Sequence, residues 1–163
     1  PVVGPGLHVE PLFREELLLA VPATHPLADA ADPLTPADLD GTEVLCLAEG
    51  HCLGDQVTEW LASVGGRRRE DFRASSLEAL RSMISGGGAV SLLPALTVAP
   101  PVAEASGLAL RRFAAPAPAR EIALVWRTNS PQAGLLAKLA PALVPTDVPD
   151  GLVTPLYRQA AAG

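Results

Sequence analysis

Three short apolar segments alternate with two amphipathic segments in the middle of this 163-residue chain. Residues 43–47 and 89–93 have the composition of buried strands, and 72–74 suits a shorter strand between them. Residues 53–64 and 77–84 carry apolar side chains at helical spacing, and glycines end both helices. The order strand, helix, strand, helix, strand predicts an α/β protein, in which a parallel sheet is covered by helices and ligands bind at the carboxyl ends of the strands.

Cys52 lies where the first of these strands leads into the first helix, in the sequence Gly-His-Cys-Leu-Gly-Asp-Gln of residues 50–56. Free amide N–H groups and the positive end of the helix dipole favour an anion there, so a thiolate is stabilised. His51 strengthens this effect if it is protonated, and Asp55 can accept a hydrogen bond or orient a neighbour. The pattern predicts a reactive cysteine. The alternative is that Cys52 is a small apolar residue packed under a loop.

Strands are also predicted on both sides of this region. Residues 7–13 alternate in polarity, and Pro11 confines that strand to an edge or places it at a strand end. Residues 16–21 form a continuous apolar strand, residues 108–110 a short one, and residues 122–126 are apolar enough for a central strand.

Helix starts and loops follow from local signals. Ser75 and Glu78 have the spacing of a capping box, and Ser130 before Pro131 predicts the N-cap of a helix that runs through Leu143. The charged run 67–71 is read as a solvated loop. Residues 146–163 show no periodicity and predict an extended or mobile tail.

Composition excludes several classes of function. The formal charge of −6 and a pI near 5.0 argue against binding of a phosphate backbone by this chain. No apolar run is long enough to cross a bilayer. Two cysteines are too few for a secreted disulfide scaffold and favour a reducing cytoplasm. The first residue is Pro1, so we expect a fragment of a longer protein.

The sequence predicts no metal site and no cofactor. His8, His25 and His51 stand far apart, and the spacings CxxC and HExxH do not occur. The glycine run 86–88 follows a helix, which is the wrong end for binding a phosphate. A hydrolase would need a base oriented toward Cys52, and the ring of an adjacent histidine usually cannot face the sulfur.

Several motifs together resemble one family, the OxyR peroxide sensors among the LysR-type transcriptional regulators. The likeness runs from about Leu7 to Leu143 and is carried by residues 18–28, 50–56, 72–84, 90–96 and 120–127. It implies a two-lobed regulatory domain resembling periplasmic binding proteins, with mostly parallel sheets and an incomplete first lobe. The resemblance divides the chain into a remnant of the first lobe (1–15), a complete second lobe (16–119), a return segment to the first lobe (120–144) and a tail (145–163).

The resemblance implies that Cys52 is the peroxidatic cysteine and that His51, Asp55 and Arg120 belong to its peroxide pocket. Two-cysteine members of the family have a resolving cysteine nine residues later, where this chain has Leu61. The other thiol, Cys46, lies within an apolar strand and is expected to be buried and inert. We therefore expect a one-cysteine mechanism, in which Cys52 is oxidised to a sulfenic acid and the loop repacks.

Three functions remain open. The first is a peroxide sensor, not an enzyme, whose partners are another copy of itself, RNA polymerase, and DNA through a helix-turn-helix domain absent from this chain. The second is a LysR-type domain that binds a small organic anion through Ser75, Ser76 and the free amides beside them, with Cys52 incidental. The third is a thiol peroxidase, which would consume peroxide catalytically.

Overall fold

A computed structural model of the chain describes residues 4–48, 50–98 and 107–156. The chain divides into two compact units, which are residues 1–16 with 119–163 (unit 1) and residues 17–118 (unit 2). Residues 157–163 of the predicted tail lie outside the described residues.

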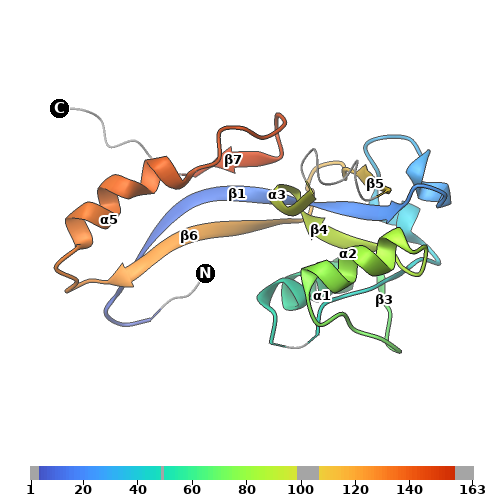
Figure 1. The fold of residues 1–163 in the computed structure, drawn as a ribbon, viewed down its shortest axis with the longest axis horizontal. Helices are drawn as coiled ribbons and strands as arrows, with labels where there is room; N and C mark the ends of the chain where they lie inside the picture. The colour runs from blue at the N-terminus through green and yellow to red at the C-terminus, as the bar shows by residue number, and fades with distance from the viewer. Residues whose placement is uncertain (1–3, 49, 99–106, 157–163) are drawn as a thin grey trace. The chain divides into compact units, whose positions relative to one another are not determined.

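One long strand, β1 (Leu7–Pro22), takes part in both units (Figure 1). Its first half pairs with β6 (Ala119–Arg127) and β7 (Val153–Pro155), and its second half with β4 (Ser91–Pro94) and β5 (Leu108–Arg111). All four pairings are antiparallel. The strands predicted over 7–13 and 16–21 are therefore parts of one strand.

Parallel pairing is confined to short segments of unit 2. It joins β2 (Glu43–Val44) to β3 (Arg67–Arg68), and single bridges join Val44 to Val90 and Leu47 to Ala74. The single bridges lie in the segments 43–47, 72–74 and 89–93 that predicted the α/β class, and this class is confirmed. The sheets are nevertheless mainly antiparallel rather than mostly parallel, because all four strands that pair with the long strand β1 run in the opposite direction.

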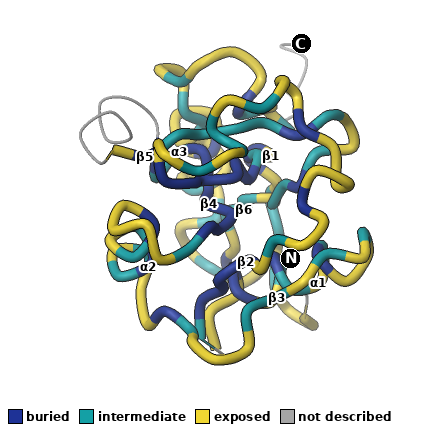
Figure 2. Tube along the Cα trace, turned by 90° about the vertical axis from the view of Figure 1, so that its right-hand side faces the viewer, coloured by how far each residue is buried: buried dark blue, intermediate teal, exposed yellow. Residues whose placement is uncertain are grey.

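The core of unit 2 forms around β1 and β4. Residues 17–22 of β1 and all of β4 are buried (Figure 2). Two predicted helices pack their apolar sides inward: α1 (Cys52–Val64) buries Leu53, Val57 and Leu61, and α2 (Leu77–Ser85) buries Leu80 and Ile84. Between β4 and β5 lies the short helix α3 (Ala95–Val98). Short 3-10 helices, η1 (Pro26–Ala28) and η2 (Pro36–Leu39), occupy the loop before β2.

Two helices begin later than the sequence predicts. The N-cap of α2 is Ser76, whose hydroxyl accepts a hydrogen bond from the Ala79 amide at 3.1 Å, so the capping box predicted at Ser75 is wrong by one residue. In unit 1, α5 (Ala133–Leu139) begins after Gln132, whereas the sequence placed Ser130 at the N-cap. The Ser130 hydroxyl instead accepts a hydrogen bond from the Gln132 amide at 3.2 Å. A 3-10 helix, η3 (Ala140–Leu143), completes the predicted helical segment.

Three further segments differ from expectation for non-local reasons. Pro11 lies inside β1, where a register shift against β6 accommodates its missing N–H. The segment 146–163, for which an extended or mobile tail was predicted, contains β7, and β7 pairs with residues 13–15 of β1. The charged run 67–71 includes β3, and its arginines pair with acidic neighbours such as Glu43, at 2.8 Å from Arg67.

Candidate functional site

Cys52 is the first residue of α1, as predicted, and its side chain is exposed. His51 is the N-cap residue in extended conformation, and its carbonyl accepts the Gly54 amide at 2.8 Å. The first amides of a helix have no intrahelical acceptor, so they can hydrogen-bond an anion at this position. The arrangement places an exposed thiol beside the first amides of the helix, where a small molecule can reach it.

His51 and Asp55 lie on the same helical turn as Cys52, and both are exposed. Their side chains form no hydrogen bond or ion pair with any described residue. Three of the predicted site residues, His51, Cys52 and Asp55, thus lie together at the start of α1. The imidazole and the carboxylate are available to a ligand.

The start of α1 lies very close to the backbone of Leu47, the residue after Cys46. A Cβ added at Gly54 would be 2.8 Å from the carbonyl oxygen of Leu47, and Leu47 is itself bridged to Ala74. Side chains do not approach backbone this closely, so Gly54 is required for the observed position of the helix start.

We expect Gly54→Ala to lower the free energy of unfolding by about 1 kcal/mol, because the clash with the Leu47 carbonyl outweighs the gain in helix propensity. Gly134 is the matched control: it lies in α5, and a Cβ there would meet nothing within 4 Å. Gly134→Ala should raise stability by up to about 1 kcal/mol. Urea unfolding of both variants checks the prediction, and equal effects would contradict it.

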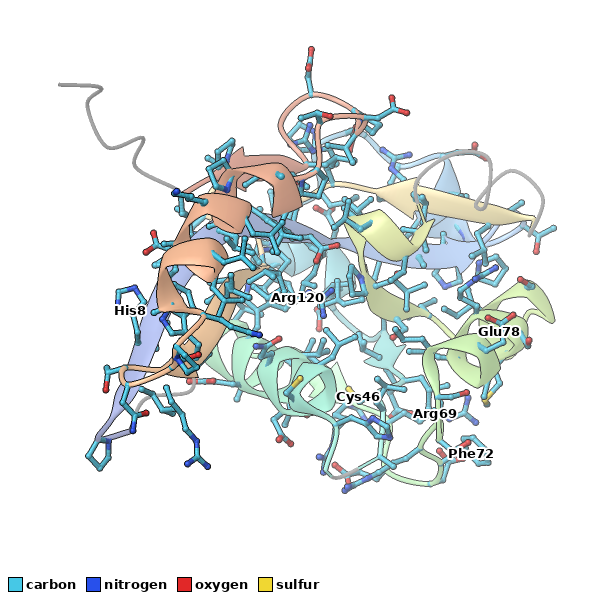
Figure 3. The ribbon with its side chains drawn as sticks, turned by 60° about the vertical axis from the view of Figure 1, so that its left-hand side comes forward. His8, Cys46, Arg69, Phe72, Glu78 and Arg120 are labelled. Carbon is cyan, nitrogen blue, oxygen red and sulfur yellow. The ribbon has the colours of Figure 1, made fainter. Side chains whose placement is uncertain are left out.

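Cys46 is 2% exposed, and its Sγ lies 3.8 Å from the Val44 carbonyl oxygen (Figure 3). Burial raises the pKa of the Cys46 thiol, an effect that a hydrogen bond with Thr58 opposes. The expected burial of Cys46 is confirmed. A buried, protonated thiol is a poor nucleophile, so Cys46 is expected to be unreactive in the folded chain.

Leu61 occupies the position where two-cysteine sensors carry a second thiol. It is 1% exposed on the inner side of α1, and a Cβ at Gly66 would touch its Cδ2 at 2.8 Å. Leu61 is therefore a tightly packed core residue.

Gln56 is a polar residue that the sequence did not single out. It lies one helical turn after Cys52, and its Oε1 atom is buried without a hydrogen-bond partner. A buried orphan acceptor destabilises the fold unless a ligand or water supplies a donor. Its position four residues after the cysteine was the only available sequence signal, since residues at that spacing share a helix face.

We expect Gln56→Met to raise the free energy of unfolding by about 1 kcal/mol, because the unpaired buried oxygen is removed without loss of volume. Gln132→Met is the control, since Gln132 is exposed and should change stability by less than about 0.5 kcal/mol. Thermal or urea unfolding measures both. A loss of stability in Gln56→Met would show that the oxygen has a partner in solution.

The remaining predicted residues lie on other elements. Ser75 and Ser76 are exposed before α2, where the Ser76 hydroxyl is already engaged as the cap. Arg120 belongs to β6 of unit 1, and its Nε donates to Glu15 Oε2 at 2.7 Å. Two cavities of unit 2, of about 310 and 260 Å³, are lined by other residues, His25 and Arg69 among them.

Within the residues that the structure describes, no three histidine, cysteine or acidic side chains gather to hold a metal ion. None of the helices in the described segments has both the length and the apolar character needed to cross a membrane.

Comparison with known proteins identifies the family. The model of the LysR substrate binding domain matches residues 1–144. The DNA-binding transcriptional dual regulator OxyR of Escherichia coli K12 is 41% identical over 133 residues, which are 82% of this chain and 43% of that protein. The chain thus spans less than half the length of this curated relative.

Solved structures of OxyR proteins also match this chain. The reduced form of OxyR matches with a TM-score of 0.71 and 38% identity over 84% of this chain and 63% of that one. A cysteine-to-serine variant of Corynebacterium glutamicum OxyR with bound hydrogen peroxide matches with a TM-score of 0.72 and 27% identity, over 85% of this chain and 45% of that one. The chain belongs to the LysR substrate-binding domain family and is homologous to the OxyR hydrogen peroxide-inducible activators.

Proposed function

We propose that this chain is the peroxide-sensing regulatory domain of a DNA-binding transcriptional regulator, and that it acts through oxidation of Cys52 alone. The observation that carries the proposal is the exposed thiol at the first position of α1. Family membership and the peroxide bound to a relative of similar fold support it.

The reaction needs one thiol. The Cys52 thiolate attacks an oxygen of hydrogen peroxide, the O–O bond breaks, and hydroxide leaves and takes up a proton to form water. The sulfur is oxidised to a sulfenic acid as the peroxide is reduced. The burial of both Cys46 and Leu61 supports a sulfenic acid rather than a disulfide as the product.

We assign three residues to this reaction beside Cys52. His51 and Asp55 flank the sulfur in sequence and can donate to or accept from a bound peroxide. Arg120 would stabilise the charge of the leaving hydroxide, because a guanidinium is a permanent cation with several donors. In the longer regulator we expect a homo-oligomer, DNA contact through a helix-turn-helix outside this sequence, and contact with RNA polymerase.

A sulfenic-acid trap tests the proposal. The chain is treated with one equivalent of hydrogen peroxide in the presence of dimedone, and the label is located by mass spectrometry. We expect stoichiometric label on Cys52. Label on Cys46 alone would reverse the assignment, and continuous peroxide consumption with a thiol reductant would favour a peroxidase.

The exposed Ser75 and the cap at Ser76 favour a second candidate, a receptor for a small organic anion held at the start of α2. Thermal unfolding with a panel of carboxylates distinguishes the two. A shift with a carboxylate that Ser75→Ala abolishes, without any effect of peroxide, would support the anion receptor.

A further inference from the structure

The cavity of about 310 Å³ in unit 2 lies at the start of the parallel segments rather than at their end. Its lining includes Glu43, where β2 begins, and Val90, which is bridged to Val44. The segment that starts at Glu43 runs to Leu47, whose carbonyl lies beside the start of α1. The cavity and Cys52 are therefore at opposite ends of one segment, and the rule that places ligands at the carboxyl ends of strands does not predict this cavity.

Arg69, which Figure 3 labels, supplies hydrogen-bond donors to the cavity wall. Its Nε and Nη2 donate to Asp71 at 2.7 and 3.1 Å, and its Nη1 donates to the Gly88 carbonyl at 2.7 Å. A guanidinium has five N–H donors, so two remain without a partner among the described residues. Because three bonds already hold the planar group, the remaining two donors have a restrained direction.

His25 and Thr42 add two further donors to the same cavity. The Nδ1 atom of His25 accepts the Leu27 amide at 3.2 Å, so in the neutral ring the proton lies on Nε2. Neither this Nε2 nor the Thr42 hydroxyl has a hydrogen-bond partner in the described part of the chain. Both residues are half-buried, which limits their contact with bulk water.

Glu43 brings an acceptor of negative charge. Its Oε1 accepts Nη2 of Arg67 at 2.8 Å, and its Oε2 is unpaired within the described segments. The hydrogen bond and charge of Asp71 raise the pKa of the Arg69 guanidinium, and the charge of Glu43 adds to this effect. Glu43 is thus close enough to Arg69 for the two charges to interact, and one small cavity is lined by both a cation and an anion.

Backbone leaves the rest of the wall open. Gly41 and Gly87 line the cavity with φ of +73° and +79°, and a Cβ at either position would meet nothing within 4 Å. The volume is at the lower end of the roughly 300–1,000 Å³ of ligand pockets, so the space suits a small molecule. A simple anion would meet Glu43 and a simple cation would meet Arg69. A ligand that carries a carboxylate and an ammonium group a few bonds apart would satisfy both.

We propose that this cavity binds a small zwitterion of the α-amino acid class. The remaining N–H groups of Arg69 and the Nε2–H of His25 bind the carboxylate, and Oε2 of Glu43 binds the ammonium group. The Thr42 hydroxyl donates a further hydrogen bond. The cavity shares no residue with the Cys52 site, so this ligand is an input to the domain separate from peroxide.

Nuclear magnetic resonance of the ¹⁵N-labelled 163-residue chain tests the proposal. The probes are the neutral L-amino acids, added up to about 10 mM, and the two halves of alanine, propionate and ethylammonium. We expect at least one amino acid to shift the amide signals of Thr42 and Gly88. Each half molecule should bind at least about tenfold more weakly than the intact amino acid, because it leaves one charged group of the cavity unpaired.

Two carboxylates provide a matched pair of variants. Glu43 and Glu70 each pair with an arginine at the surface, but only Glu43 lines the cavity. Glu43→Gln should raise the Kd of the amino acid about tenfold, and Glu70→Gln should leave it within about twofold. If Glu43→Gln does not fold, Thr42→Val decides, with an expected rise in Kd of about threefold.

Three results would overturn the inference. They are the absence of any shift with the amino acids, equal Kd values for Glu43→Gln and the wild-type chain, and propionate that binds as tightly as the intact amino acid. Dimedone labelling of Cys52 after peroxide treatment should be unchanged in Glu43→Gln. Loss of that label from the wild-type chain would contradict the peroxide proposal and leave this one standing.

Discussion

Cys52→Ser is expected to abolish peroxide-dependent dimedone labelling, whereas Cys46→Ser is expected to keep it at the wild-type level. The two thiols are six residues apart and differ in environment, since Cys52 is exposed at a helix start and Cys46 is buried. Because burial raises the pKa of Cys46, that thiol stays protonated at neutral pH and reacts slowly.

Intact mass spectrometry measures the label on each variant, and denaturation in urea before labelling provides the control. In the folded wild-type chain we expect one reactive thiol, and in urea we expect two. Peroxide-dependent label that survives in Cys52→Ser would mean that the segment around Cys46 opens in solution. Weak label in the wild-type chain that rises in Cys46→Ser would instead indicate a disulfide between the two cysteines.

Leu61→Cys should fail to create the disulfide of two-cysteine sensors unless α1 unfolds, and it should lower the free energy of unfolding by about 2 kcal/mol. The physical reason is the packing of Leu61, which is in the core of unit 2 and touches Gly66. Shortening a buried leucine removes apolar contacts and leaves a cavity.

Leu135→Cys is the matched control, because Leu135 is 66% exposed on α5 and its replacement should change stability by less than about 0.5 kcal/mol. Urea unfolding gives the stabilities, and thiol counting after peroxide treatment detects a disulfide. Rapid loss of two thiols in Leu61→Cys would show that α1 opens readily in solution.

Local sequence signals predicted the helix that carries Cys52. Apolar residues at helical spacing between Cys52 and the stop at Gly65 predicted α1, and α1 begins and ends at those positions. The burial of Cys46 followed in the same way, since an apolar strand flanked by helices is covered on both sides. Each of these features depends on residues within a few positions of one another.

The sequence alone therefore determined that Cys52 lies at a helix start and which helix carries it, because a helix is encoded by its own apolar spacing and by the glycine that ends it. Only the tertiary structure decided that β1 pairs with antiparallel partners, that β7 joins the sheet, and that the Glu15 carboxylate is sealed beneath an arginine 105 residues away. Those features depend on pairing between distant strands, and pairing is set by the packing of the whole sheet rather than by any local pattern.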